Sequence, residues 1–159
     1  MTGATVRHTL INNNTSTALA NLLANTNCIV ISNDTRVKVE SKVSHRYPDT
    51  TVVCDKIEYV ENRKDTIRNP IVIVEVLSPK TALIDRNQKL DEYTQISSLQ
   101  EYILITQDEF KVERFLRQES GDWLYTKVTG LDGVLSLPSI GCRLRLADIY
   151  KKIELTDET

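Results

Sequence analysis

The stretch that decides the fold is residues 71–81, which read IVIVEVLSPKT. Its first seven residues are apolar except for Glu75, a pattern typical of a strand that is buried on both faces at the centre of a sheet. The Ser78-Pro79 pair ends this strand. A carboxylate inside such a strand costs free energy to bury unless it is paired, hydrogen-bonded or bound to a metal, so Glu75 needs a partner.

The segments that follow this strand complete a βαβ unit. Residues 82–96 predict a helix with apolar side chains on or near one face, and residues 101–106 (EYILIT) predict a second buried strand. Strand, helix and strand in this order indicate a crossover between two parallel neighbours. The apolar period then changes to two, which predicts a meander over residues 112–117 and 123–127.

The N-terminal part is predicted to begin with a long helix over about residues 7–26. Its residues 12–17 favour other backbone conformations, because their side chains compete for backbone hydrogen bonds. The remaining expectations are strands at 28–31, 35–40, 50–54 and 143–146, a turn at 41–49, a polar surface segment at 57–68 and a short helix at 147–153.

Length, charge and hydropathy limit the class of protein. The chain has 159 residues, which fits one domain over residues 1–155 and a polar tail at 156–159. Its formal net charge is −2, so bulk charge does not attract polyanions and any nucleic-acid contact must be local. The longest apolar runs, such as residues 71–74, are far too short to span a membrane, and no signal peptide opens the chain. These features predict a soluble, cytoplasmic protein with no membrane partner.

The cysteines agree with that compartment. Cys28, Cys54 and Cys142 are widely spaced and form no CxxC pair, so we expect them to be buried small hydrophobic residues. Only His8 and His45 accompany them, without ligand spacing, and a structural zinc site is therefore not expected.

A second carboxylate lies at the start of another predicted strand. Asp49 directly precedes residues 50–54, and two acidic residues at the mouths of neighbouring strands can chelate one divalent cation. The alternative is that Glu75 is a strand-end residue paired with an arginine such as Arg36 or Arg68.

The predicted helix after Glu75 supplies a positively charged side chain, Lys89. Asp85 and Lys89 are four residues apart and project from one face, which Glu92 and Tyr93 continue one turn later. Taken alone, such a pair is most often an exposed ion pair that contributes little. Beside two metal-binding carboxylates, however, a lysine can orient a water and stabilise a charged phosphoryl transition state.

These segments together resemble a known family. The motifs that carry the resemblance are YPD at 47–49, IVIVEVLSPKT at 71–81, Asp85, KLDEY at 89–93, SLQEYILI at 98–105 and GCRLRLADIY at 141–150. They are similar to the Uma-two family of restriction endonucleases, within the PD-(D/E)xK nuclease superfamily, over almost the whole chain. The resemblance implies an α/β fold with a restriction-endonuclease-like core, in which a central mixed β-sheet carries Asp49 and Glu75 on adjacent strands and is flanked by helices.

The resemblance also implies roles for individual residues. Asp49 and Glu75 would bind Mg²⁺ or Mn²⁺, and the main-chain carbonyl of Val76 would complete the metal shell. The superfamily pattern E-x-K places a lysine where this chain has Leu77, and the resembling family supplies it from the following helix, at the position of Lys89.

The other candidates support this core. Lys80, on the turn after the strand, is the weaker candidate for the lysine. Asp85 either holds Lys89 in place or reaches a metal through water, and Tyr93 is a supporting residue on the same helix face. His8 either faces the site from the first helix or is a structural histidine.

The sequence is compatible with three functions. The leading hypothesis is a Mg²⁺-dependent endonuclease that acts on nucleic acid, DNA above all, and does so as a homodimer, because a twofold dimer most easily cuts both strands. The second is a catalytically inactive nuclease fold that serves binding or oligomerisation. It is favoured by Leu77, by the acidic balance of the chain, and by the expectation that a hairpin which the resembling family carries before the His8 helix is missing here. A carboxylate-pair hydrolase of sugars ranks last, because one Trp and two Phe offer few sugar platforms.

A nuclease also needs basic residues near its cleft. Each candidate is at least as readily explained as a solvated surface residue. The candidates are Arg36, Lys38, Lys42, Arg46, Arg63, Lys64 and Arg68.

Overall fold

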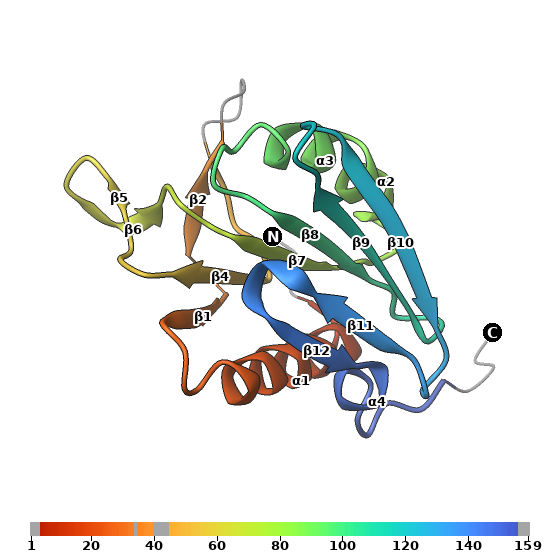
Figure 1. Cartoon of the computed structure of the whole chain (residues 1–159). Helices are drawn as coiled ribbons and strands as arrows, with labels where there is room; N and C mark the ends of the chain where they lie inside the picture. The colour runs from red at the N-terminus through yellow and green to blue at the C-terminus, as the bar shows by residue number, and fades with distance from the viewer. Residues whose placement is uncertain (1–3, 34, 40–44, 156–159) are drawn as a thin grey trace.

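The predicted central strand is β7 (Val72–Val76), and all five of its residues are buried. In this computed structural model, which describes residues 4–33, 35–39 and 45–155, β7 lies within a six-stranded sheet (Figure 1). The other strands of this sheet are β1 (Cys28–Ser32), β4 (Thr50–Cys54), β8 (Glu101–Ile105), β9 (Lys111–Arg117) and β10 (Trp123–Thr129). Their order across the sheet is β1-β4-β7-β8-β9-β10.

The two neighbours of β7 run in different directions, so the sheet is mixed. β4 is antiparallel to β7, whereas β8 is parallel to it. The parallel pair confirms the predicted crossover. β8, β9 and β10 follow one another in antiparallel order, which confirms the predicted meander.

Helices cover both faces of the sheet (Figure 1). One face is covered by α1 (Val6–Leu22) and by a C-terminal unit of β11 (Val134–Leu137), β12 (Cys142–Arg145) and α4 (Leu146–Ile149). The other face is covered by α2 (Ala82–Arg86) and α3 (Gln88–Tyr93). The predicted α/β fold, a central mixed sheet flanked by helices, is therefore confirmed.

Alternation along β7 divides the core into two layers and places the acidic residue. Val72, Val74 and Val76 pack on the α1 side, whereas Ile73 packs among the residues of the α3 side. Glu75 shares the face of Ile73, because successive side chains of a strand point to opposite faces. The carboxylate therefore points toward α3.

The prediction of one helix over residues 82–96 is wrong. The chain forms the two short helices α2 and α3, which meet at Asn87 with φ −116° and ψ −76°. Asn87 Nδ2 donates to Leu83 O at 2.9 Å, so its side chain competes with the helical hydrogen bonds at this position.

The predicted polar surface segment at 57–68 instead contributes to a second, smaller sheet. Its strands are β2 (Arg36–Lys38), β3 (His45–Arg46), β5 (Tyr59–Val60) and β6 (Arg63–Ile67), in the order β3-β2-β6-β5. The reason is apolar pairing, because Val37 and Ile67 are neighbours in the parallel pair β2 and β6 and both are buried. Within the predicted turn at 41–49, residues 45–46 form β3. Residues 41–44, which include Lys42, lie outside the described residues, as does the predicted tail at 156–159.

Two of the three cysteines are not simple buried hydrophobic residues. Cys28 in β1 lies directly opposite Cys54 in β4, and the two form a disulfide. Cys142 is free and half-buried. The prediction fails because 26 residues separate the pair in sequence, and only the strand register brings them together.

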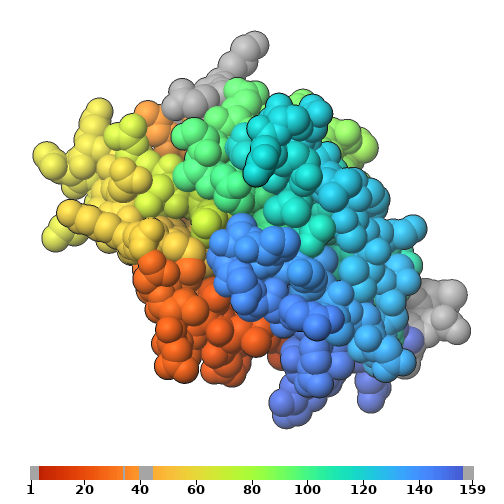
Figure 2. All heavy atoms as spheres, in the orientation of Figure 1, coloured from red at the N-terminus to blue at the C-terminus, as the bar shows by residue number. Residues whose placement is uncertain are grey.

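The C-terminal unit differs in detail from its prediction. Strand β11 was not expected, and it pairs with β12 after a 3-10 turn at Pro138–Ile140. α4 covers only four residues and lies against α1, as the space-filling view also shows (Figure 2). No helix in the described part of the chain is long and apolar enough to cross a membrane.

Candidate active site

Asp49 and Glu75 interlock at the point where β4 and β7 meet. Thr50 lies opposite Val74 in the antiparallel pair, and the same register continued by one residue sets Asp49 opposite Glu75. The Asp49 amide donates to Glu75 Oε1 at 3.0 Å, and the Val76 amide donates to Asp49 Oδ2 at 2.7 Å. The Glu75 carboxylate therefore accepts from the amide of Asp49, and the Asp49 carboxylate accepts from the amide of Val76, the residue after Glu75.

Lys89 reaches this pair from α3. Its Nζ lies 2.6 Å from Glu75 Oε2 and 2.7 Å from Asp85 Oδ1. The Tyr93 hydroxyl donates to the same Glu75 oxygen at 3.1 Å. Asp85, Lys89 and Tyr93 thus lie on one side of the α2–α3 pair, as their spacing by fours predicts, even though the helix breaks at Asn87.

Within the part of the chain that the structure describes, no arginine contacts Glu75. Both of its oxygens are bound, one by the Asp49 amide and the other by Lys89 and Tyr93. Arg36 instead donates to the Tyr47 hydroxyl. Glu75 is thus bound by Lys89 and not by Arg36 or Arg68.

Burial makes this cluster electrostatically costly. Glu75 is 2% exposed and Asp85 is 1% exposed. Desolvation raises the pKa of Glu75 to about 7, with the nearby carboxylates adding to the rise and Lys89 opposing it. Desolvation also acts to lower the pKa of Lys89, but Glu75 and Asp85 outweigh it and leave that pKa raised. Two carboxylates therefore contact one lysine and a third, Asp49, lies beside Glu75, and this excess of negative charge favours a further positive charge at this place.

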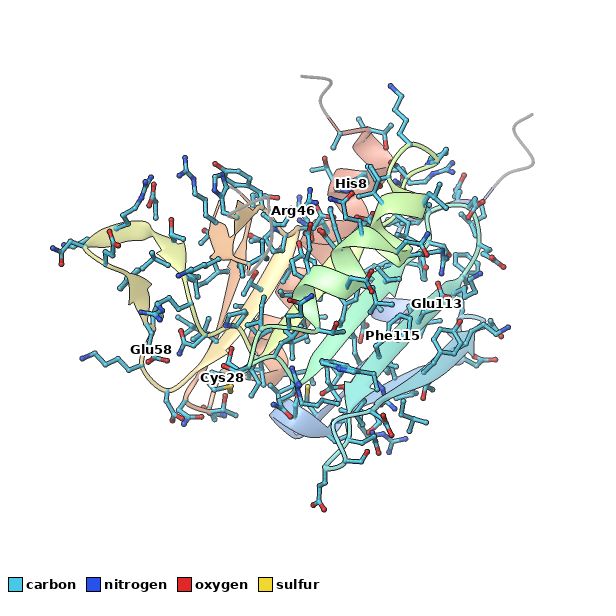
Figure 3. All side chains as sticks on the ribbon, turned by 90° about the horizontal axis from the view of Figure 1, so that it is seen from above. His8, Cys28, Arg46, Glu58, Glu113 and Phe115 are labelled. Carbon is cyan, nitrogen blue, oxygen red and sulfur yellow. A yellow bond between two sulfur atoms is a disulfide. The ribbon has the colours of Figure 1, made fainter. Side chains whose placement is uncertain are left out.

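His8 approaches Asp49 from the first turn of α1. Thr5 caps that helix by accepting from the His8 amide at 3.1 Å, which fixes where the helix begins. His8 Nε2 lies 3.2 Å from Asp49 Oδ2, and Figure 3 shows this residue at the end of α1. The hydrogen bond to Asp49 raises the pKa of His8, against the effect of its partial burial. His8 thus faces the candidate site.

A buried asparagine that sequence reasoning missed supports the Asp49 main chain. Asn12 is 2% exposed, and its Nδ2 donates to Asp49 O at 3.1 Å and to Asn33 Oδ1 at 3.2 Å. Its Oδ1 accepts from the Thr50 hydroxyl at 2.7 Å. The signal in the sequence is the run of poor helix formers at 12–17, which a buried hydrogen-bond network explains.

A second missed contact joins the small sheet to α3. Arg46 Nε and Nη2 donate to the two oxygens of Glu92 at 2.7 and 2.9 Å, a bidentate arrangement. Arg46, which Figure 3 labels, is the second residue of β3 and lies opposite Val37 of β2. The helix that carries Lys89 is thereby tied to the segment that leads into Asp49.

Lys80, the weaker lysine candidate, is exposed on the turn after β7. Leu77, at the position of the superfamily lysine, is 4% exposed and packs in the core layer that includes Tyr93. Lys89 is therefore the lysine that contacts the carboxylates.

The donor atoms at this site are those that a hard cation takes. No group of three or more His, Cys, Asp and Glu side chains in residues 4–33, 35–39 and 45–155 is arranged to hold a metal alone. The Asp49 side chain is 21% exposed and is the most accessible of the carboxylates in the cluster. A cation here would need Asp49, Glu75, a main-chain carbonyl and waters, which is a set that Mg²⁺ commonly uses.

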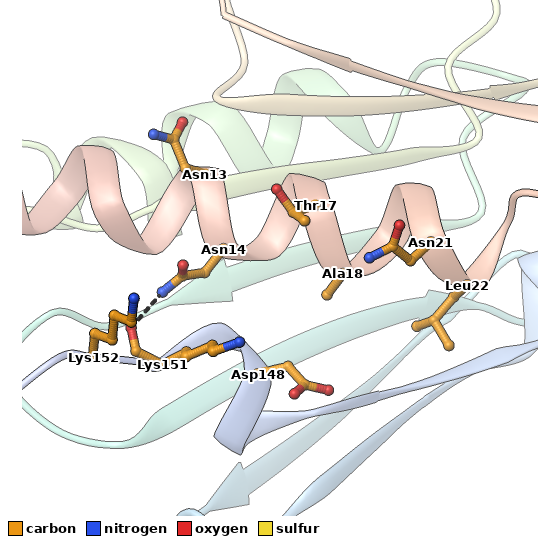
Figure 4. Close-up of a pocket in the computed structure, with 9 residues that line it drawn as sticks. All are labelled: Asn13, Asn14, Thr17, Ala18, Asn21, Leu22, Asp148, Lys151 and Lys152. Carbon is orange, nitrogen blue, oxygen red and sulfur yellow. Dashed lines mark hydrogen bonds between the residues drawn. The ribbon is translucent and has the colours of Figure 1, made fainter.

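Two surface hollows lie along the molecule. One, of about 410 Å³, is lined by residues that include Arg7, Leu77 and Arg86, and none of the candidate site residues is among them. The other, of about 420 Å³, lies between α1 and the end of α4 (Figure 4). It shares no residue with the candidate site.

Comparison with known proteins agrees with the fold. A family model described as "Uma2: Putative restriction endonuclease" matches residues 1–147. Two proteins of Synechocystis sp. (strain ATCC 27184 / PCC 6803 / Kazusa), both named as uncharacterized, are similar in sequence. One, slr1290, is 31% identical over 95% of this chain and 78% of its own length. The other, sll1609, is 32% identical over 80% of this chain and 72% of its own.

A solved structure has the same architecture. It is described as a putative nuclease belonging to DUF820 from Anabaena variabilis ATCC 29413. The match has a TM-score of 0.75 at 17% sequence identity, and it covers 94% of this chain and 83% of the other. The likeness shows a shared fold.

Proposed function

The chain belongs to the Uma2 family, and on that premise we propose that it is an endonuclease that hydrolyses phosphodiester bonds in DNA with the help of a divalent cation. The observation that carries the proposal is the contact of Lys89 Nζ with both Glu75 and Asp85, at 2.6 and 2.7 Å, beside Asp49. Burying three such charges costs several kcal/mol per ion before they attract one another. Such a cost is characteristic of sites where charge must be stabilised during a reaction.

Asp49 and Glu75 would hold the cation, Mg²⁺ or Mn²⁺, together with the main-chain carbonyl of Val76. When bound, it would supply a more acidic water and a positive charge beside the phosphate. Asp49 is suited to meet it first, because its side chain is the more exposed of the two.

The chain's own side chains would position the reacting groups. Lys89 would orient the attacking water and offset the charge that develops on the phosphoryl oxygens. Asp85 would fix the position of Lys89, and Tyr93 would fix the orientation of the Glu75 carboxylate through its hydroxyl. His8 would hold Asp49 from the other side.

The setting of this activity is part of the same proposal. We take the substrate to be DNA and the active form to be a homodimer, since cutting both strands of a duplex needs two sites in twofold relation. The cytoplasm stays a prediction from the sequence. The Cys28–Cys54 disulfide does not support it, because disulfides are rare in reducing compartments.

The proposal is tested with supercoiled plasmid, with Mg²⁺ or Mn²⁺ and with a chelator as control. We expect nicking by the wild type that the chelator abolishes and that Asp49→Asn reduces by at least about a hundredfold. Asp132→Asn changes an exposed carboxylate outside the site and should cut as the wild type does. Equal nicking by Asp49→Asn would contradict the proposed site.

One observation favours the second function, an inactive binding module. Both oxygens of Glu75 are already bound by groups of the protein, so a metal-free resting state is well satisfied. A purified protein that binds no Mn²⁺ and nicks no plasmid would support this function instead.

A further inference from the structure

An aromatic and basic cluster lies on the outer face of the small sheet. Val37, in the middle of β2, is fully buried, so strand alternation turns its neighbours Arg36 and Lys38 to the opposite face. Lys38 lies directly opposite His45 of β3. We call Arg36, Lys38, His45 and Tyr47 the Tyr47 cluster.

Tyr47 is the exposed centre of this cluster, and the Arg36 guanidinium lies over one face of its ring at 5.6 Å from the ring centre, which leaves the opposite face for a further partner. Arg36 Nε donates to its hydroxyl at 2.7 Å, and the His45 ring meets it edge-on with 5.6 Å between ring centres. Half of the Tyr47 side chain, 50%, is nevertheless open to solvent. Buried Pro48 then leads directly to Asp49, so the exposed ring lies two residues from the candidate site.

The charges around this face do not suit tight binding of a duplex. Binding to duplex DNA depends on cations that are free to neutralise phosphates. Two arginines of the small sheet are instead engaged within the protein, since Arg46 is bound to Glu92 and Arg63 to Asp65. The whole chain carries a net charge of −2. Much of the affinity for a nucleic acid must therefore come from contacts that do not depend on charge.

Base stacking is such a contact. Stacking of a base on an aromatic side chain contributes about 1–3 kcal/mol per base, with little dependence on sequence. Bases inside a duplex are already stacked on both faces, so only an unpaired nucleotide can lie on the Tyr47 ring.

We propose that the Tyr47 cluster is a stacking site for an unpaired nucleotide adjacent to the phosphodiester at Asp49 and Glu75. The substrate is then single-stranded DNA, or plasmid duplex that is locally opened where it is cut, with an unpaired base on Tyr47 and its phosphate near Arg36. This proposal rests on the nuclease function proposed above and specifies its substrate.

Binding is measured separately from cleavage. The probes are a fluorescein-labelled oligothymidylate and the duplex that it forms with its complement, followed by fluorescence anisotropy with Ca²⁺ in place of Mg²⁺. We expect the wild type to bind the single strand more tightly than the duplex. Tyr47→Ala and Tyr47→Leu should each weaken single-strand binding about tenfold, whereas Tyr47→Phe keeps the ring and should bind as the wild type does.

Tyr59→Ala is the matched control, because Tyr59 belongs to the same sheet and is 41% exposed, but lies on β5 at its far edge. It should bind as the wild type does. Unchanged binding by both Tyr47→Ala and Tyr47→Leu, or a wild type that prefers the duplex, overturns the proposal. Tyr47-dependent binding of the single strand without cleavage in Mg²⁺ or Mn²⁺ supports the stacking site and contradicts the nuclease function. Cleavage with Tyr47-independent binding contradicts the stacking site alone.

Discussion

At the scale of single residues, the candidate site depends on a conflict between burial and charge. Glu75 is almost fully buried, and it remains in the core because the Asp49 amide, Lys89 and Tyr93 together bind both of its oxygens. Desolvation still raises its pKa to about 7. The protonation state of Glu75 therefore changes in the range of pH where a nuclease works.

This shift predicts how metal binding depends on pH. A carboxyl group must lose its proton before it binds a cation, so Mn²⁺ affinity should rise between about pH 6 and pH 8. Isothermal titration calorimetry measures the affinity, and Glu75→Gln, which has no proton to lose at this position, should bind weakly at every pH. An affinity that stays constant over this range would contradict a role of Glu75 as ligand.

The raised pKa of Glu75 also predicts how the stability of the metal-free protein changes with pH. Because the pKa of folded Glu75 is raised from 4.5 to about 7, its contribution to stability is fully present below pH 4.5 and is lost as the pH rises through about 7. As the pH rises between those two values, the melting temperature of the wild type should therefore fall relative to that of Glu75→Gln. A difference between the two proteins that does not change with pH would contradict the raised pKa.

Replacing Asn12 tests whether this side chain supports Asp49, because the same replacement at Asn13 has the same effect on helix propensity but removes no contact with Asp49. Asn12→Ala leaves Asp49 O and the Thr50 hydroxyl without this partner, so we expect a loss of about 2 kcal/mol in the free energy of unfolding and weaker Mn²⁺ binding. Asn13→Ala makes the same change on the exposed side of α1 and should leave both quantities nearly unaltered. Urea denaturation and calorimetry measure the two effects. Equal behaviour of the two variants would show that Asn12 does not support Asp49.

At the scale of elements, the strands were predictable where their apolar pattern is continuous or strictly alternating. This applies to β4, β7, β8 and the β9–β10 hairpin, which form within one or two residues of the predicted ranges. Of the small sheet only β2 was predicted, within the expected strand at 35–40, because β6 is polar along most of its length and forms by pairing with β2. The break at Asn87 was also missed, since one side-chain hydrogen bond decides it.

For the candidate site, the sequence predicted which charged side chains share a face, but not which residues hold them in place. Spacing by four predicts that Asp85, Lys89 and Tyr93 share a face, and they do. The contact of Asn12 with Asp49 joins residues 37 positions apart, and only the packing of α1 against the sheet brings it about.

The disulfide gives a prediction at this scale. It links the edge strand β1 to β4 and closes a loop of 26 residues, so replacing Cys28 and Cys54 by Ser should lower the free energy of unfolding by about 3 kcal/mol. Urea denaturation under oxidising conditions measures the change. Cys142→Ser, which removes the free cysteine, should cost much less. A double variant as stable as the wild type would show that the link does not constrain the unfolded chain.

At the scale of the whole molecule, the six-stranded sheet, the four-stranded sheet and the helices α1, α2 and α3 meet at the candidate site. The main sheet supplies Asp49 and Glu75 by the pairing of β4 with β7, and α3 supplies Lys89. The small sheet is joined to α3 through Arg46 and Glu92. The single domain over residues 1–155 stays a prediction from the sequence.

We propose that Lys89, which lies between Glu75 and Asp85, orients the attacking water and offsets the negative charge that develops on the phosphoryl oxygens. The most direct measurement compares plasmid nicking by the wild type, Lys89→Ala and Lys80→Ala in Mg²⁺ or Mn²⁺. We expect Lys89→Ala to lose at least about a hundredfold in rate, because the side-chain ammonium that offsets the developing charge is gone. Lys80→Ala, which changes an exposed lysine, should cut at the rate of the wild type. Nicking by a folded Lys89→Ala at the rate of the wild type would contradict this role of Lys89.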